Sequence, residues 1–184
     1  NDPVCHDIME RLLAETNRLM YTPVEQLPPQ PKNQGGQLFD TTRTEYYENY
    51  MLYRDAAYKL AFVYQMTGDE KYAAKSFEFA DALCDLHTWV IRAHQFSIIY
   101  SRVWPWNVPV DQVVFNSDIR NGSMARILGT VYDWLYPALD RRQRDRIRGA
   151  LLEKAILPVH PHWDYHWWAV AYRCNWIGRC ADGV

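Results

Sequence analysis

The feature that most constrains this chain is apolar side chains at helical spacing on both sides of a short turn. Between residues 43 and about 66, and again between 70 and 87, apolar positions recur at intervals of three and four, which is the period of an amphipathic helix. Gly68 lies where the first helix must end, and Asp69 is suited to cap the second. This stretch therefore predicts a hairpin of two antiparallel helices.

A second hairpin with the same internal order is predicted further along the chain. Ser117 or Asp118 can cap its first helix. Pro137 breaks that helix, Asp140 restarts the apolar pattern, and Pro158 is predicted to end the second helix. No segment alternates convincingly with a period of two, so the predicted fold class is all-α.

The N-terminal segment predicts another amphipathic helix, from about residue 3 to 20. Asp2 suits its N-cap and Pro3 its first turn. Its predicted apolar stripe consists of Ile8, Met9, Leu12, Leu13, Leu19 and Met20.

The segments between the predicted helices are less regular. Residues 21–42, rich in proline and glycine, predict an irregular connection. Residues 89–103 fit a short helix or an extended segment, and 104–109, with two prolines, predict a loop.

Helical hairpins in series fit a bundle, a superhelical repeat array or a toroid of hairpins. The chain shows no strict repeat period of the kind that repeat arrays have. The sequence therefore favours a toroid of hairpins, or a fragment of one.

Length, charge and composition narrow the class of protein. At 184 residues the chain fits one domain, and 48% hydrophobic with 23% charged residues is ordinary for a globular domain. The net charge of −2 gives no overall field that would attract nucleic acid, so a polyanion would need a local basic groove. No apolar run reaches the length of a membrane span. Neither nucleic acid nor a membrane is a predicted partner.

The four cysteines are too few for a disulfide scaffold and lack the spacing of a zinc ribbon. Cys5 and Cys84 fall on apolar helix faces, where burial is predicted. Cys174 and Cys180 are close enough in sequence to pair across a loop, and the sequence leaves that open. No metal site and no cofactor are predicted.

Three stretches carry motifs. The first is the hairpin from Tyr58 to Ala73, with Thr-Gly-Asp at its turn. The second runs from Asp118-Ile119-Arg120-Asn121-Gly122 to the Tyr-Asp-Trp-Leu-Tyr segment at 132–136 and on to Leu139-Asp140. The third is Asn175-Trp176, followed by Cys180 and Gly183.

Together these stretches resemble the N-terminal α/α-toroid domain of the heparinase II/III-like polysaccharide lyases, over about residues 5 to 184. The resemblance implies that residues 1–184 form an incomplete toroid, whose remaining helices and a following β-sandwich domain are absent from this chain. It also implies a periplasmic or secreted location. The third motif departs from the family pattern at Cys174, Ile177 and Asp182, which leaves alginate, heparan sulfate, hyaluronan and chondroitin open as substrates.

Lyases of this kind cleave a uronate-containing chain by β-elimination. A base removes the C5 proton, and the glycosidic oxygen at C4 leaves with a proton from an acid. An amide that donates hydrogen bonds to the uronate carboxylate stabilises the negative charge that grows in the transition state. The resemblance implies this role for Asn175, and it places the catalytic Tyr and a groove His in absent segments, so that this chain alone would be inactive. The alternative is that Asn175 caps the helix that carries Trp176.

The segment from His160 to Trp168 is the densest run of aromatic and imidazole side chains. Its histidine spacing fits no helix-borne metal pair. Aromatic faces stack on sugar rings, and a carbohydrate groove is the favoured interpretation. The substrate-binding residues of this predicted groove are His166, Trp167, Trp168 and Trp176. The alternative is that Trp167 and Trp168 fill the core.

Two arginines are predicted to bind an anionic group. Arg120 lies near a helix start, where a cation opposes the helix dipole, and Arg173 lies beside Asn175. The arginine run at 141–146 is instead predicted to be a solvated helix face.

The predicted partner is therefore an anionic polysaccharide or oligosaccharide. Two other functions stay open. A toroidal glycoside hydrolase acting on uronyl oligosaccharides would need a pair of acidic residues, with Asp118, Asp133 and Asp164 as the candidates. A carbohydrate-binding helical module would need no catalytic residue.

Overall fold

The computed structural model describes residues 2–28, 45–90, 102–103, 108–109, 119–160, 163, 169 and 175–182. The helices of these ranges are α1 (Pro3–Leu19), α2 (Glu45–Thr67), α3 (Glu70–Cys84), α4 (Ile119–Leu135), α5 (Arg141–Leu151), the π-helical turn η5 (Leu152–Ile156), α6 (Leu157–Val159) and α8 (Asn175–Ala181). The predicted all-α class is thus confirmed for the part of the chain that the structure describes.

Two short strands accompany the helices. β1 (Arg102–Val103) pairs antiparallel with β2 (Val108–Pro109), with Arg102 opposite Pro109 and Val103 opposite Val108. The prediction that 104–109 forms only a loop is therefore wrong for Val108–Pro109. A proline is compatible with this position because each strand of a two-stranded ladder is an edge strand.

Helix α1 begins as predicted. The Asp2 carboxylate accepts a hydrogen bond from the Val4 backbone N–H at 2.9 Å, and Pro3 occupies the first turn. This cap satisfies one of the backbone N–H groups that have no partner within a helix.

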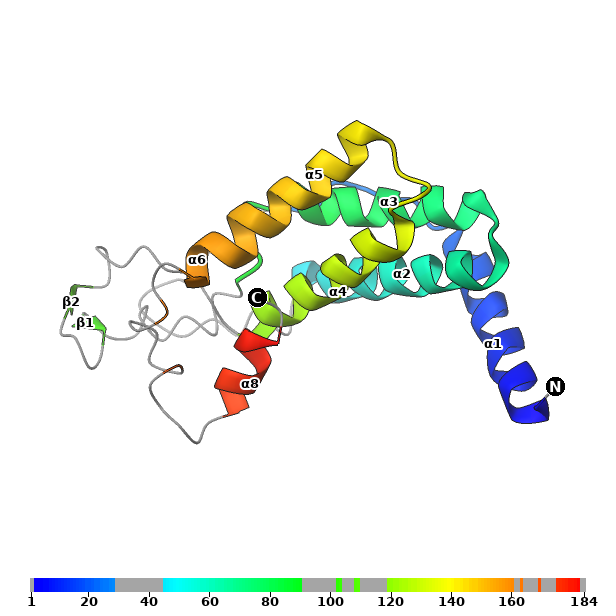
Figure 1. Ribbon diagram of the computed structural model, residues 1–184, viewed down its shortest axis with the longest axis horizontal. Helices are drawn as coiled ribbons and strands as arrows, with labels where there is room; N and C mark the ends of the chain where they lie inside the picture. The colour runs from blue at the N-terminus through cyan, green and yellow to red at the C-terminus, as the bar shows by residue number, and fades with distance from the viewer. Residues whose placement is uncertain are drawn as a thin grey trace.

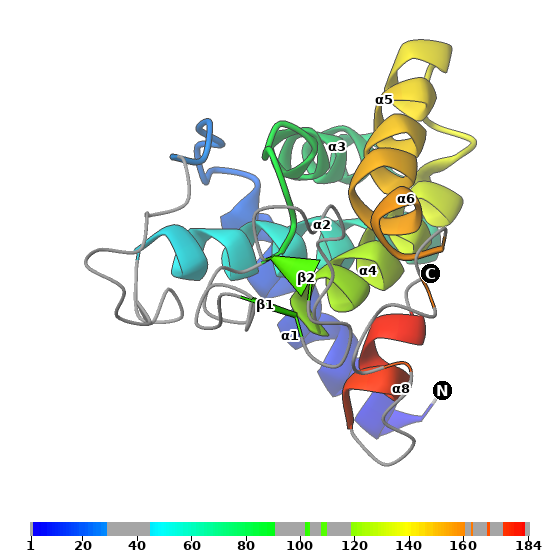
Figure 2. The same cartoon turned by 90° about the vertical axis from the view of Figure 1, so that its left-hand side faces the viewer.

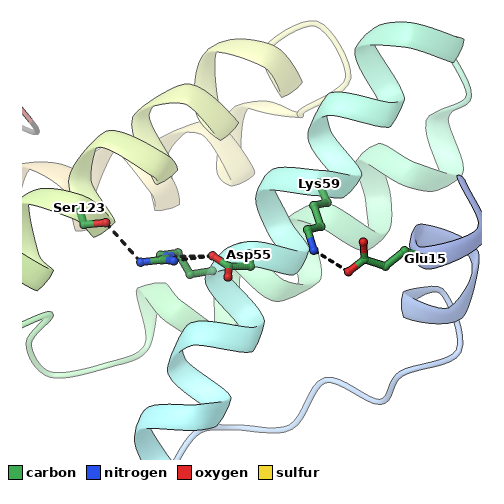
Figure 3. A network of polar contacts seen from close by, with 5 residues as sticks. Glu15, Asp55, Lys59 and Ser123 are labelled. Atoms are coloured by element: carbon green, nitrogen blue, oxygen red, sulfur yellow. Dashed lines mark hydrogen bonds and ion pairs between the residues drawn. The ribbon is translucent and has the colours of Figure 1, made fainter. Parts of the chain in front are cut away.

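An ion pair links α1 to α2. Lys59 Nζ of α2 lies 2.5 Å from Glu15 Oε1 of α1 (Figure 3).

The apolar stripe of α1 is covered only in its second half. Its later members pack against the core: Leu12, Leu13, Leu19 and Met20. Ile8 is 60% exposed and Cys5 is exposed as well, so the predicted burial of Cys5 is wrong. The N-terminal end of α1 extends beyond the other helices (Figure 1), and the stripe therefore continues past the surface on which the helix packs.

Helices α2 and α3 form the first predicted hairpin. Gly68 turns the chain with φ of 68°, a conformation that strongly favours glycine, and the Asp69 carboxylate caps α3 by accepting from the Lys71 backbone N–H at 3.2 Å. Between the helices, the Phe79 ring packs edge-on against Tyr53 with centroids 5.2 Å apart. The predicted turn is confirmed, although α3 ends at Cys84 and not at 87.

Helices α4 and α5 form the second hairpin. Pro137 lies in the turn after Leu135, and the restart at Asp140 is a reciprocal capping box. The Asp140 carboxylate accepts from the Gln143 N–H at 2.8 Å, and the Gln143 side chain accepts from the Asp140 N–H at 2.9 Å.

The two hairpins lie side by side in two layers, with α2 and α4 in one and α3 and α5 in the other (Figures 1 and 2). Arg54 of α2 donates to Ser123 Oγ of α4 at 3.2 Å. Further along both helices, the rings of Tyr58 and Phe62 lie 5.1 and 5.7 Å from the Trp134 ring. Because these contacts follow the same order on each helix, α2 and α4 run in the same direction.

Ion pairs join α3 and α5, the two helices of the second layer. Arg146 of α5 donates to Asp81 of α3 at 2.7 Å and also to Asp85. Arg141 and Arg142 are exposed, as the prediction of a solvated face requires. Arg146 keeps 39% of its side chain exposed while it pairs with the two aspartates.

The second helix of the second hairpin passes through η5 and ends at Val159, one residue beyond the predicted end at Pro158. A proline has no backbone N–H, so Pro158 cannot serve the carbonyl of Lys154, four residues before it. The buried side chain of Asn121 supplies that donor, with Nδ2 2.8 Å from the Lys154 carbonyl oxygen. A contact from 33 residues earlier in the chain therefore compensates for the proline.

Candidate functional site

Three of the predicted site residues, Arg120, Asn175 and Trp176, belong to α4 and α8, and α8 meets the beginning of α4 (Figures 1 and 2). Gly122, in the first turn of α4, lies against the backbone of α8. A Cβ atom placed on Gly122 would overlap the Arg179 carbonyl oxygen and lie 2.8 Å from Cys180 Cα. The two helices therefore approach more closely than any side chain at position 122 would allow.

A small apolar cluster and one ion pair complete this contact. Val159 and Cys180 are fully buried at its centre, and Ile119, Trp176 and Ile177 pack against them with Ala169. At the surface, Arg126 Nε lies 3.1 Å from an oxygen of Asp182.

Arg120 lies one residue before Asn121 in α4 and is half-buried. Its guanidinium carbon is 5.2 Å from the centroid of the Tyr47 ring of α2, which is the geometry of a cation–π contact. The structure thus places the predicted anion-binding arginine between α2 and α4, at the end of α4 where α8 docks.

A second arginine lies in the same layer and was not predicted from the sequence. Arg54 is only 13% exposed, and its Nε and Nη2 donate to one oxygen of Asp55 at 2.8 and 2.6 Å. Its partners Asp55 and Ser123 are labelled in Figure 3. The only local signal is an arginine within an aromatic-rich helix, followed directly by an aspartate.

Asn175, the predicted catalytic residue, is the first residue of α8. It precedes Cys180 by five residues, which corresponds to about 7.5 Å along a helix axis. Trp176 is half-buried against the Val159–Cys180 cluster. The description of Asn175 extends to its backbone, and its two predicted roles, hydrogen-bond donor to substrate and helix cap, stay predictions.

The other predicted site residues lie outside the described residues: His166, Trp167, Trp168 and Arg173. Their assignment to a carbohydrate groove stays a prediction. Two members of the same aromatic run are described: His160 is exposed, and Trp163 is 37% exposed.

The cysteines divide by environment. Cys84 is buried as predicted, and burial raises the pKa of its thiol to about 12, so it stays neutral and unreactive at neutral pH. Cys180 is buried beneath α4. Cys174 lies outside the described residues, and its pairing with Cys180 is untested.

The described ranges contain no group of three His, Cys, Asp or Glu side chains placed to hold a metal ion. None of the helices described there combines the length and the apolar character needed to cross a membrane.

A scan against protein-family models and a search of curated proteins found no match to this chain. The resemblance to the heparinase II/III-like family therefore rests on the sequence motifs alone.

Proposed function

We propose that the chain is the N-terminal α/α-toroid portion of a polysaccharide lyase that cleaves uronate-containing polysaccharide by β-elimination. The observation that carries the proposal is the docking of α8, which begins with Asn175 and Trp176, on the turn of α4 that contains Arg120 and Gly122. Two of the family-like motifs, 53 residues apart when counted from Gly122 to Asn175, thus meet at one end of the hairpin pair.

The arrangement of the hairpins supports a toroid over an up-and-down bundle. In such a bundle, helices that neighbour one another in space alternate in direction. Here α2 and α4 pack directly and run in the same direction, through the contacts of Arg54 with Ser123 and of Tyr58 with Trp134. When hairpins repeat side by side with the same orientation, their first helices run parallel and form the inner wall of a ring. Further hairpins of the same kind would close that ring.

The chemistry follows from charge. An ionised uronate resists loss of its C5 proton because the product carbanion adds charge next to a carboxylate. The Asn175 amide would donate hydrogen bonds to that carboxylate, with Trp176 as a stacking surface; Arg120, on the turn of α4 where α8 docks, would supply a cation. When the base takes the C5 proton, the C4–O bond breaks, its electron pair leaves with the glycosidic oxygen, and that oxygen receives a proton as the C4–C5 double bond forms.

No observation favours the hydrolase alternative. Of its three acidic candidates, Asp118 and Asp164 lie outside the described residues. Asp133 is exposed near the end of α4. It lies thirteen residues after Arg120, about 20 Å along the helix axis, and so it belongs to the opposite end of α4.

The test is to incubate the full-length protein with alginate, heparan sulfate, hyaluronan and chondroitin in turn. Ultraviolet absorbance of unsaturated uronate is recorded together with reducing ends. Elimination produces both signals, hydrolysis produces reducing ends only, and a binding module produces neither. Either of the last two results contradicts the proposal.

Asn175→Ala should lower kcat about 10²- to 10³-fold, the scale for removal of one donor to a developing oxyanion, with a smaller change in KM. Asn17→Ala is the matched control, because Asn17 accepts its hydrogen bond from Tyr72 at the far side of the hairpin. Unchanged turnover in Asn175→Ala would leave that residue only its capping role.

A further inference from the structure

Three successive residues at the start of α4 contact three different elements, and we name them the junction turn (Arg120, Asn121 and Gly122). Arg120 lies over the Tyr47 ring of α2, Asn121 donates to the Lys154 carbonyl in η5, and Gly122 abuts the backbone of α8. Successive residues of a helix are rotated by about 100° around its axis, so three residues of one turn can contact three neighbouring elements. The junction turn therefore fixes α8 relative to both hairpins.

The contact at Gly122 leaves no room for adjustment. The atoms that a Cβ would meet are the Arg179 carbonyl oxygen and Cys180 Cα, which are backbone atoms. A rotamer change cannot move them, and only a displacement of α8 as a unit can. Four other glycines of the described ranges have open space at the Cβ position, namely Gly68, Gly129, Gly149 and Gly178.

Two other described contacts join α8 to its neighbours. They are the Val159–Cys180 cluster and the ion pair between Arg126 and Asp182, whose side chains are 47% and 63% exposed. Exposed ion pairs contribute little. A shift at Cys180 would therefore be transmitted along α8 to Trp176 and Asn175.

We infer that Gly122 is a positioning residue: the absence of a side chain there sets the place of α8, and through it the place of Asn175 and Trp176 at the substrate. Its effect on turnover rests on the proposed function, whereas its effect on the docking of α8 does not.

Gly122→Ala in the full-length protein tests the inference, and Gly129→Ala is the matched control. Gly129 lies on the same helix and has nothing within 4 Å of its Cβ position. The first readout is maleimide labelling in the presence of a phosphine reductant, resolved by peptide mapping. Exposed Cys5 labels in every variant, and buried Cys84 reports whether the hairpins stay folded. Cys180, buried beneath Gly122, should label faster in Gly122→Ala and stay protected in Gly129→Ala.

The second readout is elimination on the substrate found for the wild type. A misplacement of about 1 Å lowers turnover about 10²-fold, so kcat of Gly122→Ala should fall by that factor with KM much less affected. Gly129→Ala should keep wild-type kcat.

The inference is overturned if Cys180 stays as protected in Gly122→Ala as in the wild type, or if it becomes exposed while kcat is unchanged. A wild type without elimination activity would refute the proposed function, and the labelling would still decide whether Gly122 sets the place of α8. If Gly122→Ala does not fold, Ile177→Ala serves instead, since it removes an apolar contact of α8 and leaves α4 intact. The same exposure of Cys180 and loss of kcat are expected, and their absence overturns the inference.

Discussion

The paired hairpins and helix α8 are held by contacts of different kinds. Large rings meet within the first hairpin, as Phe79 does with Tyr53, and between the two hairpins, as Trp134 does with Tyr58, and Leu60 is fully buried. Helix α8 is seven residues long and docks through Gly122 and a cluster centred on Val159 and Cys180. The hairpins are stabilised by buried apolar area, whereas α8 is placed by the close approach of two backbones.

This difference separates stability from the candidate chemistry. Buried apolar area contributes roughly 25 cal/mol per Å², so the free energy of unfolding comes mainly from the hairpins. Elements with few buried contacts open locally at lower free energy than the whole protein unfolds. Asn175 and Trp176 therefore belong to the part of the chain whose position responds most to small changes in packing.

The largest expected effect lies in the hairpin core. Leu60→Ala should lower the free energy of unfolding by about 2–5 kcal/mol, through lost burial and the cavity left behind. Leu52→Ala is the control on the same helix, because Leu52 is 43% exposed and surface changes of this kind fall within about 0.5 kcal/mol. Urea unfolding followed by circular dichroism measures both. Equal losses for the two variants would break the contrast between core and surface contacts.

An intermediate effect is expected where the hairpin joins the α8 region. Asn121→Ala leaves the Lys154 carbonyl without the donor that Pro158 cannot provide, and it should lower stability by about 1–3 kcal/mol. Pro158→Ala restores a backbone N–H four residues after Lys154. In that background, the loss from Asn121→Ala should shrink by about 1 kcal/mol, within the range of coupling for residues in one network. Urea unfolding of the four proteins of the cycle gives the coupling, and strictly additive losses would show that Asn121 does not compensate for the proline.

The local elements of the fold were predictable because their causes are close in sequence. Asp2 with Pro3, Gly68 with Asp69, and the restart at Asp140 each satisfy or shape the backbone within four residues, and all three predictions are confirmed. The predicted end at Pro158 agrees with the observed end at Val159 to one residue, but the hydrogen bond from Asn121 to Lys154 comes from another helix and has no local signal. Cys5 was wrongly placed in the core since periodicity identifies the apolar face of a helix and not how much of it is covered.

The candidate site was predictable by residue type and less so by geometry. The sequence identifies Arg120 because a cation at a helix start has no benefit for the helix, and the residue does lie at the start of α4. Gly122 has no such signal, because nothing in its sequence neighbours indicates that α8 packs there. A glycine in the first turn of a helix signals close packing only once the partner is known.

The smallest expected effect separates charge from shape in the two regions. Arg146 joins α3 to α5 through Asp81 and Asp85, and Arg126 joins α4 to α8 through Asp182 alone. The hydrogen bond to Asp81 raises the pKa of Arg146 further, so the arginine stays charged at any pH used, and salt is the appropriate probe. Arg146→Gln should lower stability by about 1 kcal/mol and Arg126→Gln by about 0.2 kcal/mol, the two ends of the range for exposed ion pairs.

Urea unfolding at low and high sodium chloride measures both losses. The Arg146→Gln loss should shrink in 1 M salt, where the Debye length falls to about 3 Å. A larger loss for Arg126→Gln than for Arg146→Gln would mean that charge, and not the close contact at Gly122, holds α8 on the hairpins. The labelling of Cys180 in Arg126→Gln would then rise as it does in Gly122→Ala, whereas docking by shape predicts that Cys180 stays protected when only the ion pair is removed.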